Sequence, residues 1–210
     1  MKIALDAMGG DFAPLVNIEG AREALKINKN IEKLFLVGDT KILEEMCAKH
    51  KLTDPRVEIV HAGSVVEMHE SGAKTLRSKK DSSVSIATGL VKSGDADAVI
   101  SAGNTGAAVA NATLKLRTLK GVERAGICSP LPNEHGTCNL LDAGANPDAK
   151  PEHLVNYAIM GAVYAKEVLG VENPTVGIMS NGEEDEKGTP FTKETFKLIT
   201  ELVESGKAPF

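Results

Sequence analysis

Four segments of the sequence place polar side chains and glycines directly after apolar runs, where they could bind an anion. The clearest of them follows an apolar run and contains Ser101, Gly103, Asn104, Thr105 and Gly106. The two glycines allow a ligand to approach the backbone, and Asn104 or Thr105 could cap a helix that begins here. Free N–H groups and the dipole of such a helix N-terminus favour phosphate. The spacing matches neither a P-loop nor GxGxxG, and the alternative is a capped, tightly packed helix without a ligand.

Two further segments combine carboxylates with glycines at predicted strand ends. Asp6 and Asp11 bound the segment 6–11, where they could hydrogen-bond a ligand, hold a loop or bind a metal, and Asp11 could instead cap the following helix. Asp142 lies at the edge of an apolar run, where a carboxylate is costly unless it has a partner or a function, and Asn146 follows it. In an α/β sheet, the carboxyl ends of the strands are where ligands bind.

The fourth segment, residues 180–189, surrounds one cation with acidic side chains. It contains Asn181, Glu183 and Lys187, bracketed by glycines. An ammonium group in such a loop can act as a point charge for phosphate. The alternative is a charged surface turn.

A cluster of cations at Arg77, Lys79 and Lys80 precedes Ser82, which could cap the next helix. Because the whole chain has a net charge of −5, this cluster could mark where an anionic partner docks. The alternative is a solvated helix end.

Composition and spacing argue against several classes of protein. The chain has 24 basic and 29 acidic residues and only 3% aromatic residues, which is unlike a nucleic-acid-binding protein. Its five histidines show no zinc-site spacing, and it has no GxSxG motif. Its three cysteines are widely spaced and lack a CxxC pair, which favours a reducing, cytoplasmic compartment over a disulfide framework.

Alternating strands and helices must position these segments. We predict strands at 2–7, 33–38, 56–61, 96–101, 125–131, 138–143 and 175–179, with helices between most of them. Asp39 and Pro151 are expected to start two of these helices, and Gly94 is expected to end another. The continuous apolar runs and repeated strand–helix units predict an α/β fold with three layers, α/β/α, around a mostly parallel, doubly wound sheet.

One connection breaks this alternation. Only six residues join 125–131 to 138–143, too few for a crossover helix, so these strands should form an antiparallel hairpin and make the sheet mixed. We expect one α/β domain over residues 1–210. Because the chain ends where another strand should start, we also expect it to be a fragment of a longer protein.

Together, these segments resemble the bacterial phosphate acyltransferase family of phospholipid synthesis (PlsX-type, acyl-acyl-carrier-protein:phosphate acyltransferase). The matching stretches are IALDAMGGD, LRSKKDSS, ISAGNTGA, LLDAGANPDAKPEHL and SNGEEDEKGT, in the family's order. The resemblance implies an isopropylmalate-dehydrogenase-like and phosphotransacetylase-like fold, with no cofactor and no metal. The family's enzymes extend further at the C-terminus, so the resemblance implies that this chain is the N-terminal majority of a longer enzyme whose C-terminal part is absent.

The resemblance also implies a reaction, in which inorganic phosphate attacks the thioester of a long-chain acyl-acyl carrier protein. The acyl phosphate formed would pass to a membrane glycerol-3-phosphate acyltransferase for phosphatidic acid synthesis. A cytoplasmic homodimer with peripheral membrane association is implied as well. The alternatives are a phosphotransacetylase-like enzyme that uses acyl-CoA, and a noncatalytic anion- or lipid-binding module.

Roles for the candidate residues follow from this resemblance and from what acyl transfer requires. Phosphate should lie on the turn from Ser101 to Gly106, and the catalytic candidates are Lys187, Asn104 and Asn181. The substrate-binding candidates are Asp11, Asp142, Asn146, Glu183 and Ser82, together with Arg77, Lys79 and Lys80, which would meet the acidic carrier protein. The two aspartates are expected to orient other groups, since phosphate is already anionic at pH 7.

Overall fold

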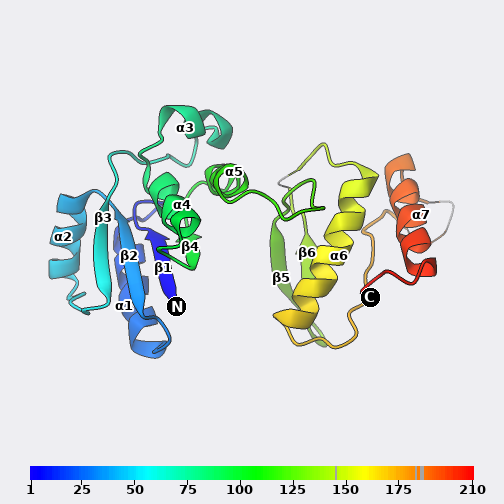
Figure 1. Cartoon of the computed structure of the whole chain (residues 1–210), viewed down its shortest axis with the longest axis horizontal. Helices are drawn as coiled ribbons and strands as arrows, with labels where there is room; N and C mark the ends of the chain where they lie inside the picture. Colours follow the sequence, from blue (N-terminus) through cyan, green and yellow to red (C-terminus); the bar gives the residue numbers. More distant parts are fainter. Residues whose placement is uncertain (145, 183, 185–186) are drawn as a thin grey trace. The chain divides into compact units, whose positions relative to one another are not determined.

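The computed structural model describes residues 1–144, 146–182, 184 and 187–210, which fall into two units, Met1–Arg117 (unit 1) and Thr118–Phe210 (unit 2). Each unit has its own strands and helices (Figure 1). The single domain over residues 1–210 stays a prediction.

Unit 1 alternates strands with helices, as its apolar runs predict. Its elements are β1 (Lys2–Asp6), α1 (Leu15–Ile27), β2 (Lys33–Gly38), α2 (Thr40–Lys49), β3 (Val57–His61), α3 (Gly72–Ser78), α4 (Ser83–Ser93), β4 (Ala98–Ser101) and α5 (Thr105–Lys115). The short α3 is not among the predicted elements, because its mostly polar sequence has no apolar period.

The four strands of unit 1 form a parallel sheet in the order β3–β2–β1–β4. The chain moves outward from β1 through β2 to β3, and then returns to place β4 on the other side of β1. The boundary between β1 and β4 is therefore the topological switch point. Open α/β sheets bind ligands there, beyond the carboxyl ends of the strands.

Helices cover both faces of this sheet. Leu5 of β1 belongs to one core with Ile18 of α1 and Leu43 of α2, whereas Ala4 belongs to a second core with Ala87 of α4. Consecutive residues of a strand point to opposite faces, so a strand covered on both sides needs an unbroken apolar run. The predicted α/β class, with helices flanking a mostly parallel sheet, is confirmed.

Unit 2 contains β5 (Cys128–Asn133), β6 (Gly136–Leu141), α6 (Pro151–Glu167) and α7 (Pro190–Glu204). β5 and β6 form the predicted antiparallel hairpin, in which Asn133 lies opposite Gly136. In the described chain this hairpin is a sheet of its own, so it does not make the parallel sheet mixed. Within the described residues, no helix has both the length and the apolarity needed to cross a membrane.

The strand predicted at 175–179 is wrong, because the structure shows this segment as irregular chain. A β-branched run becomes a strand only where a neighbouring edge supplies ladder hydrogen bonds. In the part of unit 2 that the structure describes, β6 pairs with β5 alone. The segment instead forms part of the wall of a cavity.

Arg56 ties the start of β3 to the loop between α1 and β2. Its guanidinium donates to both carboxylate oxygens of Asp54, at 2.9 and 2.7 Å. It also donates to the carbonyl oxygens of Leu25 at 2.6 Å and Ile31 at 3.1 Å. Hydrogen bonds from Arg56, first the side-chain and then the backbone contact, hold the pKa of Asp54 to about 2.

This pair predicts how the fold responds to acid. The pKa of Asp54 lies below its ordinary value of 3.8, so its stabilising effect is present above that value and is lost as the pH falls through about 2. An NMR titration of the Asp54 carboxyl should have its midpoint near 2, and Arg56→Met should move that midpoint upward. Equal midpoints in the two proteins would contradict the assignment.

Candidate functional site

The first turn of α5 presents two backbone donors at the switch point. Thr105 and Gly106 are the first residues of the helix, so their N–H groups have no carbonyl acceptor one turn earlier. Both residues are exposed. We call these two N–H groups the anion seat, because they lie at the positive end of the helix dipole. The geometry is what a phosphate site requires, and phosphate binding there stays a prediction.

Asn104 caps α5 and also holds a loop against it. Its Oδ1 accepts a hydrogen bond from the Ala107 N–H at 2.9 Å. Its Nδ2 donates to the carbonyl oxygens of Glu67, Met68 and Glu70, at 3.0, 3.1 and 2.8 Å. Both ends of the amide are therefore engaged within the protein, which makes Asn104 the residue that positions the loop 67–70 beside the anion seat.

A buried carboxylate supports the turn that precedes α5. Asp6 at the end of β1 is only 2% exposed, and its Oδ2 accepts a hydrogen bond from the Ser101 hydroxyl at 2.7 Å. The Ser101 oxygen in turn accepts from the Gly103 N–H at 3.1 Å. Ser101 and the Gly103 N–H therefore stabilise the turn itself. The groups that remain available to a ligand are the N–H groups of Thr105 and Gly106.

Gly9 and Gly103 leave room for the Asp6 carboxylate because neither has a side chain. A side chain at Gly9 would collide with Asp6, and its Cβ would lie 3.0 Å from the Gly103 Cα. The loop after β1 and the loop after β4 therefore approach each other closely at the switch point. Asn17 fixes the first loop, since its Nδ2 donates to the carbonyl oxygens of Ala7 at 3.0 Å and Gly9 at 2.9 Å.

Asp11 is exposed in the loop after β1. The alternative that it caps the following helix is wrong, because α1 begins at Leu15 with Pro14 at the N-cap position. The carboxylate is therefore not needed to start the helix, and its role towards a ligand stays a prediction.

One of the three cations in the basic cluster is already paired within the protein. The Lys79 ammonium forms an ion pair with Glu70 at 2.6 Å and donates to the Val65 carbonyl oxygen at 2.7 Å. The hydrogen bond from Lys79 lowers the pKa of Glu70. Arg77 and Lys80, by contrast, have exposed side chains. Only these two cations of the cluster present their charge to solvent.

Ser82 occupies the N-cap position of α4, as its sequence context predicts. It is 1% exposed, and its hydroxyl has no hydrogen-bond partner among the described residues. The predicted side-chain cap is therefore not formed, and only the Ser82 carbonyl oxygen contributes to the start of α4, by accepting from the Ile86 N–H at 2.8 Å. The predicted contact of Ser82 with substrate stays a prediction.

In unit 2, Asp142 and Asn146 come together after β6, as the predicted segment requires. The Asp142 carboxylate accepts from the Asn146 backbone N–H at 3.1 Å and from Asn146 Nδ2 at 3.2 Å. Asn146 Nδ2 also donates to the Tyr157 hydroxyl at 3.0 Å. Burial, followed by the charge of Asp142, raises the pKa of Tyr157. We call these three residues the polar corner, and their contacts give Asp142 the partners that its position demands.

Lys187 and Asn181 are exposed in the loop before α7. The Lys187 N–H donates to the Glu184 carbonyl oxygen at 2.9 Å. Gly182 lies so close that an added Cβ would be 2.7 Å from the Lys187 Cγ. Glu183 lies outside the described residues. The catalytic roles of Lys187 and Asn181 stay predictions.

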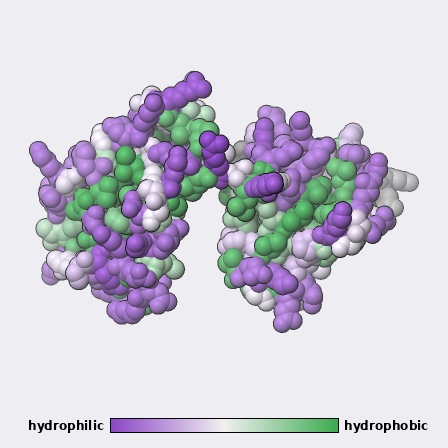
Figure 2. Space-filling model, in the orientation of Figure 1, coloured by the Kyte–Doolittle hydropathy of each residue, from purple (hydrophilic) through white to green (hydrophobic). Residues whose placement is uncertain are grey.

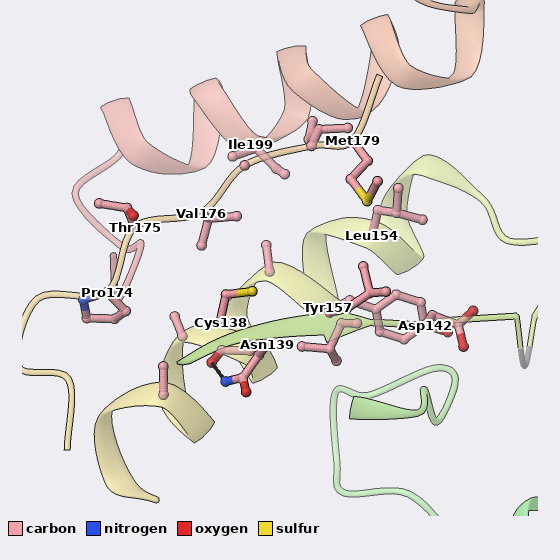
Figure 3. A pocket seen from close by; sticks show the side chains of 18 of the residues that line it. Cys138, Asn139, Asp142, Leu154, Tyr157, Pro174, Thr175, Val176, Met179 and Ile199 are labelled. Carbon is pink, nitrogen blue, oxygen red and sulfur yellow. Dashed lines mark hydrogen bonds between the residues drawn. The ribbon is translucent and has the colours of Figure 1, made fainter. Parts of the chain in front are cut away.

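The polar corner adjoins a cavity in unit 2. A cavity of about 760 Å³ is lined by β6, α6, α7 and the irregular segment 174–179 (Figure 3). A second cavity of about 310 Å³ contains Asn146 and shares Leu141, Asp142, Leu154, Tyr157 and Phe191 with the first. Figure 3 shows Tyr157 and Asp142 at one end of the larger cavity.

The sequence names Asp6 as a residue that could hold a loop, but it does not reveal that Asp6 is buried, because the burial depends on pairing with a strand almost a hundred residues later. One part of the candidate site, Gly72, is missing from the sequence-based prediction. Gly72 begins the short α3, and a Cβ there would collide with the carbonyl carbon of Gly106 and the amide nitrogen of Ala107. A single sequence does not reveal that only glycine fits at position 72, because the requirement comes from the packing of α3 against α5.

Gly72 predicts a stability change that can be measured. Gly72→Ala forces α3 away from the first turn of α5, so the free energy of unfolding should fall by about 1–3 kcal/mol in urea denaturation. Gly20→Ala is the control, because it lies inside α1 with no heavy atom within 4 Å of an added Cβ. It should raise stability by about 0.5–1 kcal/mol. Equal behaviour of the two variants would contradict the close packing of α3 on α5.

A family model and several relatives match most or all of this chain. A family model described as "Fatty acid synthesis protein" matches residues 1–207. A phosphate acyltransferase of Akkermansia muciniphila is 61% identical over the whole chain, and one of Geobacter sulfurreducens is 47% identical over 96% of it. The chain spans 60% and 58% of the length of these two relatives.

A solved structure shares the fold. The EutD phosphotransacetylase from Staphylococcus aureus superposes with a TM-score of 0.65 at 22% sequence identity, covering all of this chain and 66% of that one. The predicted resemblance is therefore confirmed at the level of family and of fold. The chain belongs to the PlsX-type fatty acid synthesis protein family, whose curated relatives are phosphate acyltransferases.

Proposed function

We propose that the protein takes part in transferring a long-chain acyl group from the thioester of acyl carrier protein to inorganic phosphate. The observation that carries this proposal is the anion seat at the switch point, found in a chain whose curated relatives are phosphate acyltransferases. A phosphate oxygen attacks the thioester carbonyl, the carbon–sulfur bond breaks, and the carrier thiolate takes up a proton. The products are acyl phosphate and free carrier protein.

The anion seat contributes to this reaction mainly by position and charge. The two N–H groups hold phosphate at the positive end of α5, which lowers the entropy cost of bringing the nucleophile to the carbonyl. The Asp6–Ser101–Gly103 chain of hydrogen bonds keeps the turn rigid before the ligand arrives. Because this support is preorganised, no reorganisation is needed as the charge moves.

Lys187 is the candidate for stabilising the charge that develops on the carbonyl oxygen. Its side chain is exposed on a loop held by Gly182 and the Glu184 carbonyl. An ammonium group is a compact point charge with three donors, which suits either phosphate or an oxyanion. Asn181 on the same loop would add a hydrogen bond.

Arg77 and Lys80 are proposed to meet the carrier protein. They are the exposed members of the basic cluster, since Lys79 is paired with Glu70. Charge complementarity of this kind accelerates encounter and fixes orientation more than it adds affinity. We further propose a homodimer in the cytoplasm, peripheral membrane association, and delivery of acyl phosphate to a membrane glycerol-3-phosphate acyltransferase.

The reaction is tested by trapping acyl phosphate with hydroxylamine. The 210-residue chain and the full-length protein that contains it are incubated with phosphate and either palmitoyl-acyl carrier protein or palmitoyl-CoA. Phosphate-dependent hydroxamate from the carrier substrate is expected with the full-length protein. Product from CoA alone would favour the phosphotransacetylase-like alternative, and phosphate binding without product would favour a noncatalytic module.

Lys187→Met separates a transition-state role from ground-state binding. If Lys187 stabilises developing charge, the turnover number of the full-length protein should fall roughly 100-fold or more with little change in the KM for phosphate. Lys41→Met on α2 is the control, because Lys41 is also exposed. Wild-type kinetics in Lys187→Met would favour the alternative, in which Lys187 belongs to a charged surface turn and has no role in the reaction.

The carrier contact is tested by reversing two charges. Arg77→Glu with Lys80→Glu should raise the KM for palmitoyl-acyl carrier protein about tenfold at low salt, and the effect should shrink as salt screens it. Lys41→Glu with Lys49→Glu on α2 changes the net charge equally and should leave that KM unchanged. An equal rise in both double variants would show a nonspecific effect of net charge.

A further inference from the structure

The cavity of unit 2 is apolar along most of its length. Its volume of about 760 Å³ lies within the range of about 300–1,000 Å³ that is usual for small-molecule sites. Leucine, isoleucine, valine and methionine side chains reach it from four different elements, and α6 offers it a face of small residues. Exposed to water, such a lining is unfavourable in proportion to its apolar area. The cavity therefore suits an apolar occupant.

Tyr157 and Asp142 lie together at one end of this cavity, Val176 and Ile199 line its middle beneath α7, and Thr175 lies towards the far end (Figure 3). A ligand that matches a mostly apolar lining with one charged corner is an extended hydrocarbon with one polar terminus. An acyl group has this form, and the curated relatives are named for acyl transfer.

The polar corner favours a neutral terminus over a charged one. The Tyr157 hydroxyl donates a long hydrogen bond to the Ala125 carbonyl oxygen, 3.5 Å, so a ligand carbonyl that came closer would compete for this donor. The Asp142 carboxylate beside it would repel a carboxylate or a phosphate. The Arg124 guanidinium is on the surface and donates a long hydrogen bond, 3.4 Å, to Asn146 Oδ1. A thioester or ester carbonyl satisfies the corner without placing like charges together.

We propose that this cavity binds the hydrocarbon chain of the acyl substrate, with the neutral carbonyl end at the polar corner and the chain running under α7. The identity of the ligand rests on the proposed function, whereas the fit rests on the lining. The surface of unit 2 also suits an apolar ligand, because hydrophobic residues gather over β5, β6 and α6 in Figure 2. The segment 175–179 then serves as a wall of the binding site.

Cys138 provides a probe inside the cavity. Its side chain lines the cavity from β6 and is labelled in Figure 3, and the thiol is free and exposed. Cys128 on β5 is half-buried and is not part of the lining. The rate of maleimide modification at each cysteine of the 210-residue chain is measured by peptide mass spectrometry, with and without methyl laurate as a neutral long-chain ester.

Methyl laurate should slow the modification of Cys138 at least tenfold and leave Cys128 unchanged. Methyl butyrate should not protect, because each two-carbon extension is expected to tighten binding roughly tenfold while the cavity has room. Laurate, which carries a carboxylate, should protect less well than its methyl ester. Equal protection by all three compounds, or protection of both cysteines, would overturn the proposal.

Filling the cavity should abolish this protection. Val176→Trp and Thr175→Trp place an indole in the cavity from a segment without regular structure, so at least one is expected to fold. Val163→Trp is the matched control, since Val163 is exposed on α6 and outside the lining. Protection that persists in a folded filling variant would place the acyl chain elsewhere.

This outcome is independent of acyl transfer. The labelling assay contains neither phosphate nor carrier protein, so it reports on the cavity alone. A chain that forms no acyl phosphate but shows length-dependent protection of Cys138 would refute the proposed function and keep the binding site. An active full-length protein in which methyl laurate does not protect Cys138 would support the proposed function and refute the binding site.

Discussion

The parallel pairing of β1 with β4 is the contact on which the candidate site depends. It sets Asp6 opposite Ser101, at the carboxyl ends of two strands that are far apart in the sequence. The buried carboxylate is costly without partners, and the Ser101 hydroxyl supplies one. That bond shapes the turn, and the turn leads into α5, whose exposed first two residues supply the anion seat. A change in the register of these two strands would therefore displace the anion seat.

The sequence predicted those parts that local chemistry decides. Asp39 caps α2 as expected, with its carboxylate accepting from the Ile42 N–H, and Gly94 ends α4 in the left-handed conformation. Pro151 opens α6, and Asn104 caps α5. Each of these signals acts within one turn of the chain, so a single sequence displays it.

Other parts depend on contacts between distant residues, and the sequence did not reveal them. The apolar pattern of 175–179 suits a strand, but strand formation also needs a free edge in the right place. The use of both ends of the Asn104 amide depends on a loop more than thirty residues earlier. The engagement of Lys79 by Glu70 likewise follows from tertiary packing, which changes how much of the basic cluster is available.

The close approach of backbone at Gly9, Gly72 and Gly103 has a consequence for how this site could diversify. Any side chain at these positions meets backbone or the buried carboxylate, so substitution there alters the fold before it alters the ligand. Variation in ligand preference must therefore come from residues that face outward, such as Thr105 and the loop held by Asn104. An engineering library aimed at new anions would gain most by sampling that loop while keeping the three glycines constant.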